Sequence, residues 1–191
     1  MKAINLKTEY LVDPIGIDVQ HPRLMWNCAG GKTQTAYRVT ASTADKTVWD
    51  SGKTASSSMT VRYPAALASR QRVTWTVQLW DETDCAGETE SAFFETGLLS
   101  ERDWGAKWIA GDYRVDRKKR YPVDCFRRSF EAKTTVRARL YITACGLYEA
   151  SINGERVGKF VLAPGHTDYT KRIQYQTYDV TSLVKEGENA L

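Results

Sequence analysis

Residues 145–169, which read CGLYEASINGERVGKFVLAPGHTDY, combine aromatic rings with hydroxyl, amide, imidazole and carboxylate groups. Sugars present apolar faces to aromatic rings and hydroxyl groups to fixed polar side chains, so carbohydrate sites combine both kinds of residue. Tyrosines of this kind also fit a packed β-sandwich with no ligand, and that alternative stays open. Tyr175 and Tyr178 add two more rings nearby. The candidate carbohydrate-binding residues are Tyr148, Asn153, His166, Asp168 and Tyr169.

Acid–base or nucleophilic catalysis finds little support in the other titratable residues. Asp50 and Asp81 each follow a tryptophan, and at the end of a strand aspartate more often starts a turn through its own side chain. His21 and His166 each lie beside a proline or glycine, which is typical of loops, and no G-x-S-x-G elbow accompanies them. We therefore expect no catalytic residue in this chain.

Metal binding is also not indicated by the cysteines. Cys28, Cys85, Cys125 and Cys145 form no C-x-x-C pair, and only two histidines could supplement them. We expect no metal site and reduced thiols, as in a cytoplasmic protein, although a mature secreted protein would look the same. The N-terminal residues have no apolar stretch of a signal peptide, and no membrane span is expected.

The run RVDRKKRY, residues 114–121, is the one dense basic cluster. Such a run could meet phosphates, with Tyr113 and Tyr121 stacking on bases, but a solvated loop explains it equally well. The net charge of the chain is +4, from 27 basic and 23 acidic residues. That surplus is small and looks evenly spread, so we expect no nucleic-acid partner.

Alternation at period two predicts an all-β fold. In residues 73–80, Val73, Trp75, Val77 and Leu79 alternate with polar residues and Trp80, and residues 37–42 alternate in the same way. A third alternating segment covers residues 136–144. Turn residues separate short strands up to about residue 99, and about seven strands are typical of an immunoglobulin-like or fibronectin-III-like sandwich. We therefore place a first β-sandwich module at residues 1–99.

A second β-sandwich module is expected at residues 100–191, with the domain boundary near residues 97–105. Trp104 and Trp108 would pin the connecting segment, GLLSERDWGAKWIAGDYR, against one or both sandwiches. Within it, Asn153-Gly154 predicts a type I′ hairpin that returns Val157 opposite Ala150. YDVTSLVKEG reads as a strand, one helical turn and a glycine stop, and ENAL starts another strand. We expect this module to be a jelly-roll cut short at its C-terminus, and its uncovered apolar face to favour self-association.

The order of ten short stretches, among them DPIGIDVQHPRLMW, SRQRVTWTVQLWD, ARLYITACGLYEASINGERVG and LAPGHTDYTKR, resembles the N-terminal region of bacterial α-L-rhamnosidases, a family of multidomain glycoside hydrolases. The resemblance covers essentially the whole chain. It implies an immunoglobulin-like module and a jelly-roll module associated with carbohydrate recognition, ahead of an α/α barrel that holds the catalytic carboxylates of an inverting hydrolase.

This resemblance implies a non-catalytic accessory region that packs on a downstream catalytic domain. The partners it implies are rhamnose-containing glycans, which the parent enzyme would bind. It also implies a calcium ion in some relatives, for which Asp168 could supply a ligand, although no acidic cluster surrounds it in the sequence. A free-standing two-sandwich interaction or adhesion module with no enzyme attached is the alternative.

Overall fold

The computed structural model describes residues 1–44, 46–116 and 118–191, and these divide into two compact units, Met1–Trp104 and Gly105–Leu191. Both units are built from β-strands, and the only helical element described is a 3₁₀ turn, η1 (Glu101–Asp103). The expected all-β fold is therefore confirmed. None of the described helices has the length and apolar character that crossing a membrane requires.

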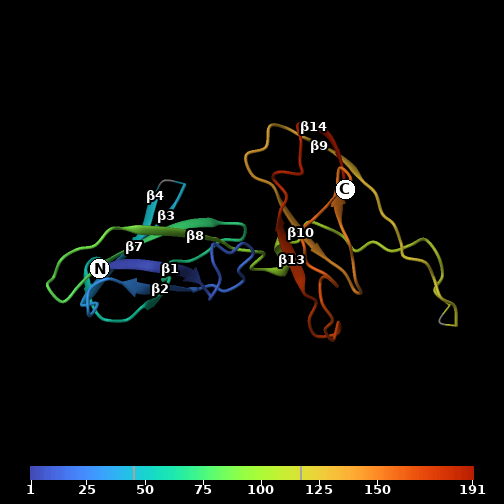
Figure 1. The fold of residues 1–191 in the computed structure, drawn as a ribbon. Coiled ribbons are helices and arrows are strands. Elements are labelled where there is room, and N and C mark those ends of the chain that lie inside the picture. The colour runs from blue at the N-terminus through green and yellow to red at the C-terminus, as the bar shows by residue number, and fades with distance from the viewer. Residues whose placement is uncertain (45, 117) are drawn as a thin grey trace. The chain divides into compact units, whose positions relative to one another are not determined.

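The first unit is a sandwich of two antiparallel sheets (Figure 1). One sheet has the order β1-β2-β6, and the other has the order β4-β3-β7-β8 with β5 also paired to β3. The strands are β1 (Lys2–Thr8), β2 (Arg23–Ala29), β3 (Ala36–Thr43), β4 (Lys46–Asp50), β5 (Thr54–Ala55), β6 (Thr60–Arg62), β7 (Arg72–Trp80) and β8 (Glu90–Glu95).

The core of this unit follows from the period-two pattern of its central strands. Every second residue of β7 is buried, beginning at Val73, and Tyr37, Val39 and Ala41 of β3 are buried in the same way. These side chains meet Leu24 and Trp26 of the opposite sheet in one apolar cluster. Alternation in the sequence thus predicted both strands and their inner faces correctly.

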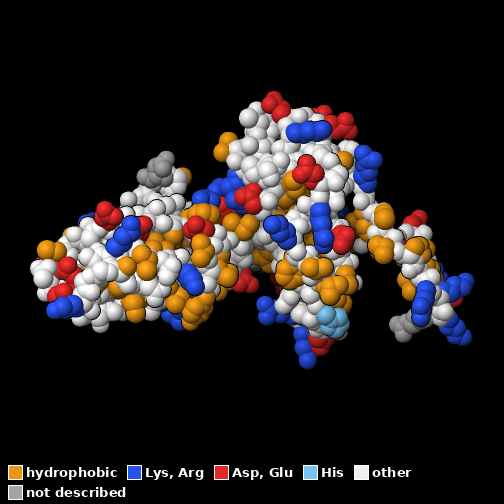
Figure 2. Space-filling model, in the orientation of Figure 1, with side chains coloured by type: hydrophobic (Ala, Val, Ile, Leu, Met, Phe, Trp, Pro, Cys, Tyr) orange, Lys and Arg blue, Asp and Glu red, His pale blue; other side chains and the backbone are white. Residues whose placement is uncertain are grey.

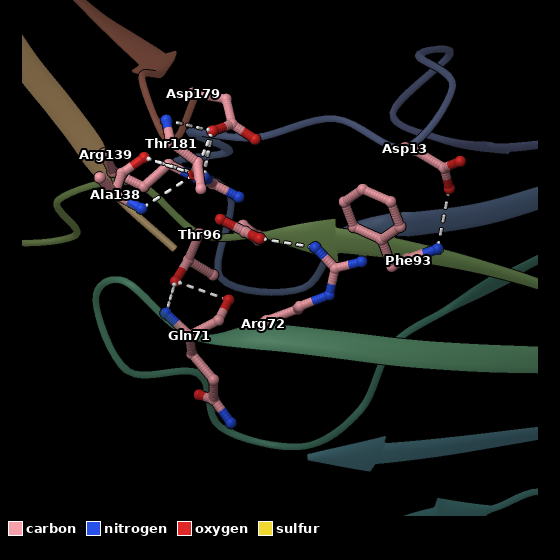
Figure 3. Close-up of polar contacts among 10 residues, drawn as sticks. Asp13, Gln71, Arg72, Phe93, Thr96, Ala138, Arg139, Asp179 and Thr181 are labelled. Atoms are coloured by element: carbon pink, nitrogen blue, oxygen red, sulfur yellow. Dashed lines mark hydrogen bonds and ion pairs between the residues drawn. The ribbon is translucent and has the colours of Figure 1, made fainter. Parts of the chain in front are cut away.

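Polar pairs close the end of this sheet where β7 begins and β8 ends. Arg72 and Glu95 are register partners, and their side chains form an ion pair of 2.8 Å although Glu95 is buried (Figure 3). The guanidinium of Arg72 also lies 3.4 Å from the centre of the Phe93 ring. The hydroxyl of Thr96 accepts a hydrogen bond from the backbone of Gln71, so the buried polar groups here have partners.

The second unit consists of three two-stranded antiparallel pairs, drawn mainly in orange and red in Figure 1. They are β9 (Ser129–Ala132) with β14 (Gly187–Ala190), β10 (Arg139–Thr143) with β13 (Tyr175–Asp179), and β11 (Ser151–Ile152) with β12 (Glu155–Arg156). Its apolar cluster is small, with Ile152, Val157 and Val180 fully buried. The pairing of Arg139 with Asp179 across β10 and β13, at 2.8 Å, adds an ion pair (Figure 3).

Two sequence predictions about this unit need correction. The strand expected at residues 136–144 covers only Arg139–Thr143, and Val136 is 93% exposed because it lies in the loop before the strand. Trp108, expected to pin the connector, is 64% exposed, whereas Trp104 is half-buried at the end of η1. A hydrophobic residue in the sequence does not reveal whether a neighbour covers it.

We predict that Leu79→Ala lowers the free energy of unfolding of the first unit by about 2–5 kcal/mol, because it leaves a cavity in a closely packed core. Urea unfolding followed by tryptophan fluorescence measures this, since five of the six tryptophans lie before Gly105. Thr74→Ala, at an exposed position on the same strand, is the matched control and should cost less than about 1 kcal/mol. Equal losses for the two variants would contradict the two-layer arrangement.

Candidate functional site

The hairpin at residues 147–157 positions the first candidate, Tyr148. Asn153 and Gly154 have φ angles of 54° and 85°, as a type I′ turn requires, and the Val157 amide donates to the Ala150 carbonyl over 2.8 Å. The side chains of residues 148, 150 and 152 point inward, while residues 147, 149 and 151 are exposed. The hairpin predicted from Asn-Gly is therefore confirmed, including which side chains face inward.

The Tyr148 hydroxyl is held inside the unit rather than offered to a ligand. It lies 3.1 Å from the Gln176 side-chain oxygen and 3.2 Å from the Tyr178 hydroxyl, both on β13. Partial burial, together with the hydrogen bond to Tyr178, raises the pKa of Tyr148 far above its usual value. The backbone of Tyr148 pairs with Ala163, so Tyr148 fixes the start of the loop at residues 163–172.

Both polar atoms of the Asn153 side chain form hydrogen bonds within the second unit. Its amide nitrogen donates to the Leu183 carbonyl over 2.9 Å and to the Asn189 side-chain oxygen over 2.8 Å, and its own oxygen accepts from the Ala190 amide over 3.0 Å. Asn189 is buried and in turn bonds to the backbone of Lys185 and Gly187. These bonds fasten the hairpin to β14 and to the turn before it.

The loop at residues 163–172 carries the other three candidates. The rings of His166 and Tyr169 lie 5.7 Å apart, with His166 exposed and Tyr169 half-buried. Figure 2 shows hydrophobic side chains next to the one histidine of the second unit. Asp168 lies between them in the sequence, exposed to solvent and 3.6 Å from the Lys171 ammonium.

Asp168 is ionised at neutral pH and its geometry is fixed. The hydroxyl of Thr170 donates to its carboxylate over 2.6 Å and the Thr170 amide over 3.1 Å, and these bonds lower the pKa of Asp168. The Gln176 amide donates to the Pro164 carbonyl at the base of the loop. An exposed carboxylate on the same loop as an exposed imidazole and a half-buried phenol ring can accept hydrogen bonds from sugar hydroxyls.

Among the described residues, no group of three or more histidine, cysteine or acidic side chains has the geometry to hold a metal ion.

The two aspartates that follow a tryptophan, Asp50 and Asp81, hold turns with their side chains. Asp50 accepts a hydrogen bond from the Gly52 amide and forms an ion pair with Arg38. Asp81 accepts hydrogen bonds from the Thr83 and Cys85 amides. His21 bonds to the Tyr63 carbonyl.

The sequence reasoning missed Gln176 and Asn189. Gln176 lies two residues before Tyr178 on β13, so alternation alone would have placed both on the face that meets Tyr148. Asn189 had no such signal, because its partners are 36 residues away in the hairpin or are backbone groups of its own turn.

The two antiparallel sheets of the first unit define it as a β-sandwich of the immunoglobulin-like class, an architecture that many unrelated proteins share. Two family models match the chain, "Rha78A-like, N-terminal immunoglobulin domain" over residues 3–100 and "Alpha-L-rhamnosidase N-terminal domain" over residues 133–191. The chain therefore belongs to the family of α-L-rhamnosidase N-terminal domains.

Individual relatives agree with the family models. An α-L-rhamnosidase of Formosa agariphila is 37% identical over 96% of this chain and 22% of its own length. The solved structure of the α-L-rhamnosidase from Dictyoglumus thermophilum is similar over 100% of this chain and 24% of its own, with 36% identity and a TM-score of 0.87. The solved structure of the α-L-rhamnosidase from Aspergillus terreus is similar over 99% of this chain and 23% of its own, with 33% identity and a TM-score of 0.82. The chain thus spans less than a quarter of these relatives.

We predict that Asn153 stabilises the second unit. Asn153→Gly keeps the positive φ angle but removes three hydrogen bonds, and should cost about 1–3 kcal/mol. Asn153→Ala should cost about 1 kcal/mol more, because alanine resists a positive φ. Native-state hydrogen exchange of β11–β14 amides measures both. Glu155→Ala, exposed on the same hairpin, is the control, and a neutral Asn153→Gly would show that the side chain is free for another role.

Proposed function

We propose that this chain is the N-terminal accessory region of an α-L-rhamnosidase and contributes no group to hydrolysis. The observation that carries the proposal is the similarity along the whole chain to less than a quarter of enzymes with that name. Inverting hydrolysis needs two carboxylates about 6.5–9.5 Å apart around a water molecule. Asp50 and Asp81 are instead engaged in turns. The alternative of a free-standing adhesion module gains no support from the comparisons.

In this proposal the second unit packs against the rest of the enzyme. Four exposed apolar side chains on the outer side of the hairpin and the segment after it support the proposal: Leu147, Phe160, Val161 and Leu162. Exposed apolar groups of this kind mark surfaces that a partner covers. Glu149 and Arg156, paired at 3.3 Å on the outer face of the same hairpin, supply a polar rim.

The purified chain is expected to release no detectable product from an aryl α-L-rhamnoside, because the catalytic carboxylates lie elsewhere in the enzyme. A colorimetric assay measures this, with the complete α-L-rhamnosidase of Dictyoglumus thermophilum as positive control. Turnover that persists through repeated purification and disappears with a change in the chain's own Asp50 or Asp81 would overturn the proposal.

A second role is recognition of rhamnose-containing glycans by the loop at residues 163–172. It is favoured by the Asp168 carboxylate, held by Thr170, and by the neighbouring rings of His166 and Tyr169 on the same loop. The hydroxyl of Tyr148 and the amide of Asn153 already have partners within the unit, so in this role they support the loop and the hairpin. A calcium ion would need further oxygen ligands around Asp168, such as loop carbonyls.

Titration of the chain with L-rhamnose is expected to give binding heat that Asp168→Asn and Tyr169→Ala each reduce at least about tenfold in affinity, since each removes a polar or stacking contact. Glu155→Ala is the control, because it changes an exposed side chain of the hairpin outside this loop and should leave the affinity within about twofold. Absence of heat both with calcium and with a chelator would leave the loop a structural role alone.

A further inference from the structure

The basic tip, defined here as residues 114–121, is a braced loop rather than an unstructured charge run; residue 117 lies outside the described part of the chain. The rings of Tyr113 and Tyr121 stack at 4.8 Å with an interplanar angle of 18°. The Asp116 amide donates to the Tyr121 hydroxyl over 2.7 Å, and the Lys119 amide donates to the Asp116 carbonyl over 3.0 Å. The tip is therefore closed at its base by the two tyrosines and held by backbone hydrogen bonds of Asp116 and Lys119.

Residues on both sides of the tip hold the Tyr113 ring in its position against Tyr121. The Tyr113 hydroxyl lies 3.1 Å from both carboxylate oxygens of Asp124. A Cβ atom at Gly111 would lie 2.2 Å from the Tyr113 ring, so only glycine lets the ring take this position. The tip thus presents its charged side chains from a preorganised base, which lowers the entropic cost of binding.

The charges of the tip are left available to a ligand. Arg114, Lys118 and Arg120 are exposed and, among the residues that the structure describes, form no ion pair. The one acidic residue of the tip is Asp116. Its carboxylate accepts a hydrogen bond from the Lys118 amide and lies 3.9 Å from the Lys119 ammonium. Figure 2 shows Lys and Arg side chains gathered at the end of this segment, which is drawn yellow in Figure 1.

The surplus of positive charge belongs to the unit that carries the tip. Residues 105–191 hold 16 basic and 10 acidic residues, whereas residues 1–104 hold 11 basic and 13 acidic residues. The even spread expected from the sequence is therefore wrong at the level of units. A positive field over one unit attracts polyanions to it and raises their association rate.

We propose that the basic tip binds anionic polysaccharide, that is, glycan chains carrying sulfate or uronate groups. Arginine and lysine pair with sulfate and carboxylate through charge-assisted hydrogen bonds. The choice of a glycan rests on the proposed function, because the relatives are glycosidases. Nucleic acid is disfavoured because Tyr113 and Tyr121 stack on each other and thus each has a ring face withheld from bases.

The test measures binding of fluorescent heparin and of polygalacturonate by anisotropy at several salt concentrations, with neutral dextran as the uncharged comparison. The variant Lys118→Gln, Lys119→Gln, Arg120→Gln should weaken binding at least about tenfold at low salt and flatten the salt dependence. The matched control is Lys133→Gln, Lys159→Gln, Lys185→Gln, which removes the same charge from exposed positions of the same unit and should change affinity less than about threefold.

Tyr121→Ala, which removes the brace and no charge, should weaken binding about threefold or more if the tip is preorganised. Equal effects of the two triple variants would overturn the proposal, and so would tighter binding of duplex DNA or of phosphatidylserine vesicles with the same dependence on the tip. Loss of L-rhamnose binding or absence of an enzyme partner would leave this result unchanged, so failure of the proposed function is seen separately. Circular dichroism verifies that each variant folds.

Discussion

The hydrogen bond between the exposed Asn153 and the buried Asn189 is the constraint on which the second unit depends. Asn189 uses its oxygen for Asn153 and for the Lys185 amide, and its nitrogen for the Lys185 and Gly187 carbonyls. A buried polar group left without a partner costs about 1–3 kcal/mol, so the neighbours of the Asn189 side chain must stay in place. The hairpin, β14 and the turn before it are therefore held in one arrangement.

Such a polar connection is needed because the apolar core of this unit is small. Among the described residues of this unit, the buried hydrophobic side chains are Ile152, Val157, Ala163 and Val180, and only a few partly buried neighbours pack against them. The first unit has two larger sheets and buries Trp75, Tyr63 and Phe94, so its apolar packing is more extensive. The two units are thus stabilised by different physical means.

This difference leaves the second unit with more surface for other roles. The loop with Asp168, the apolar side chains that follow the hairpin and the basic tip all lie in segments without regular strands. Loops positioned by a rigid scaffold carry most binding functions, because their side chains are not committed to a sheet.

The sequence by itself determined the all-β fold, the inner faces of β3 and β7, the hairpin at Asn153-Gly154 and the family. Each of these rests on local rules: alternation at period two, the φ angles that a type I′ turn requires, and the order of short motifs. These rules act between neighbours in the chain, so they can be read without a structure.

Only the tertiary structure decided which candidate side chains are free. It gave Tyr148 and Asn153 partners 28 to 37 residues away, left Asp168 and His166 exposed, and uncovered Trp108 and Val136. Whether a polar group is satisfied, or an apolar group covered, depends on residues that folding brings from elsewhere in the chain. That is the physical reason why the residue types suggested candidates, whereas only the fold decided which of their side chains already have partners inside the unit.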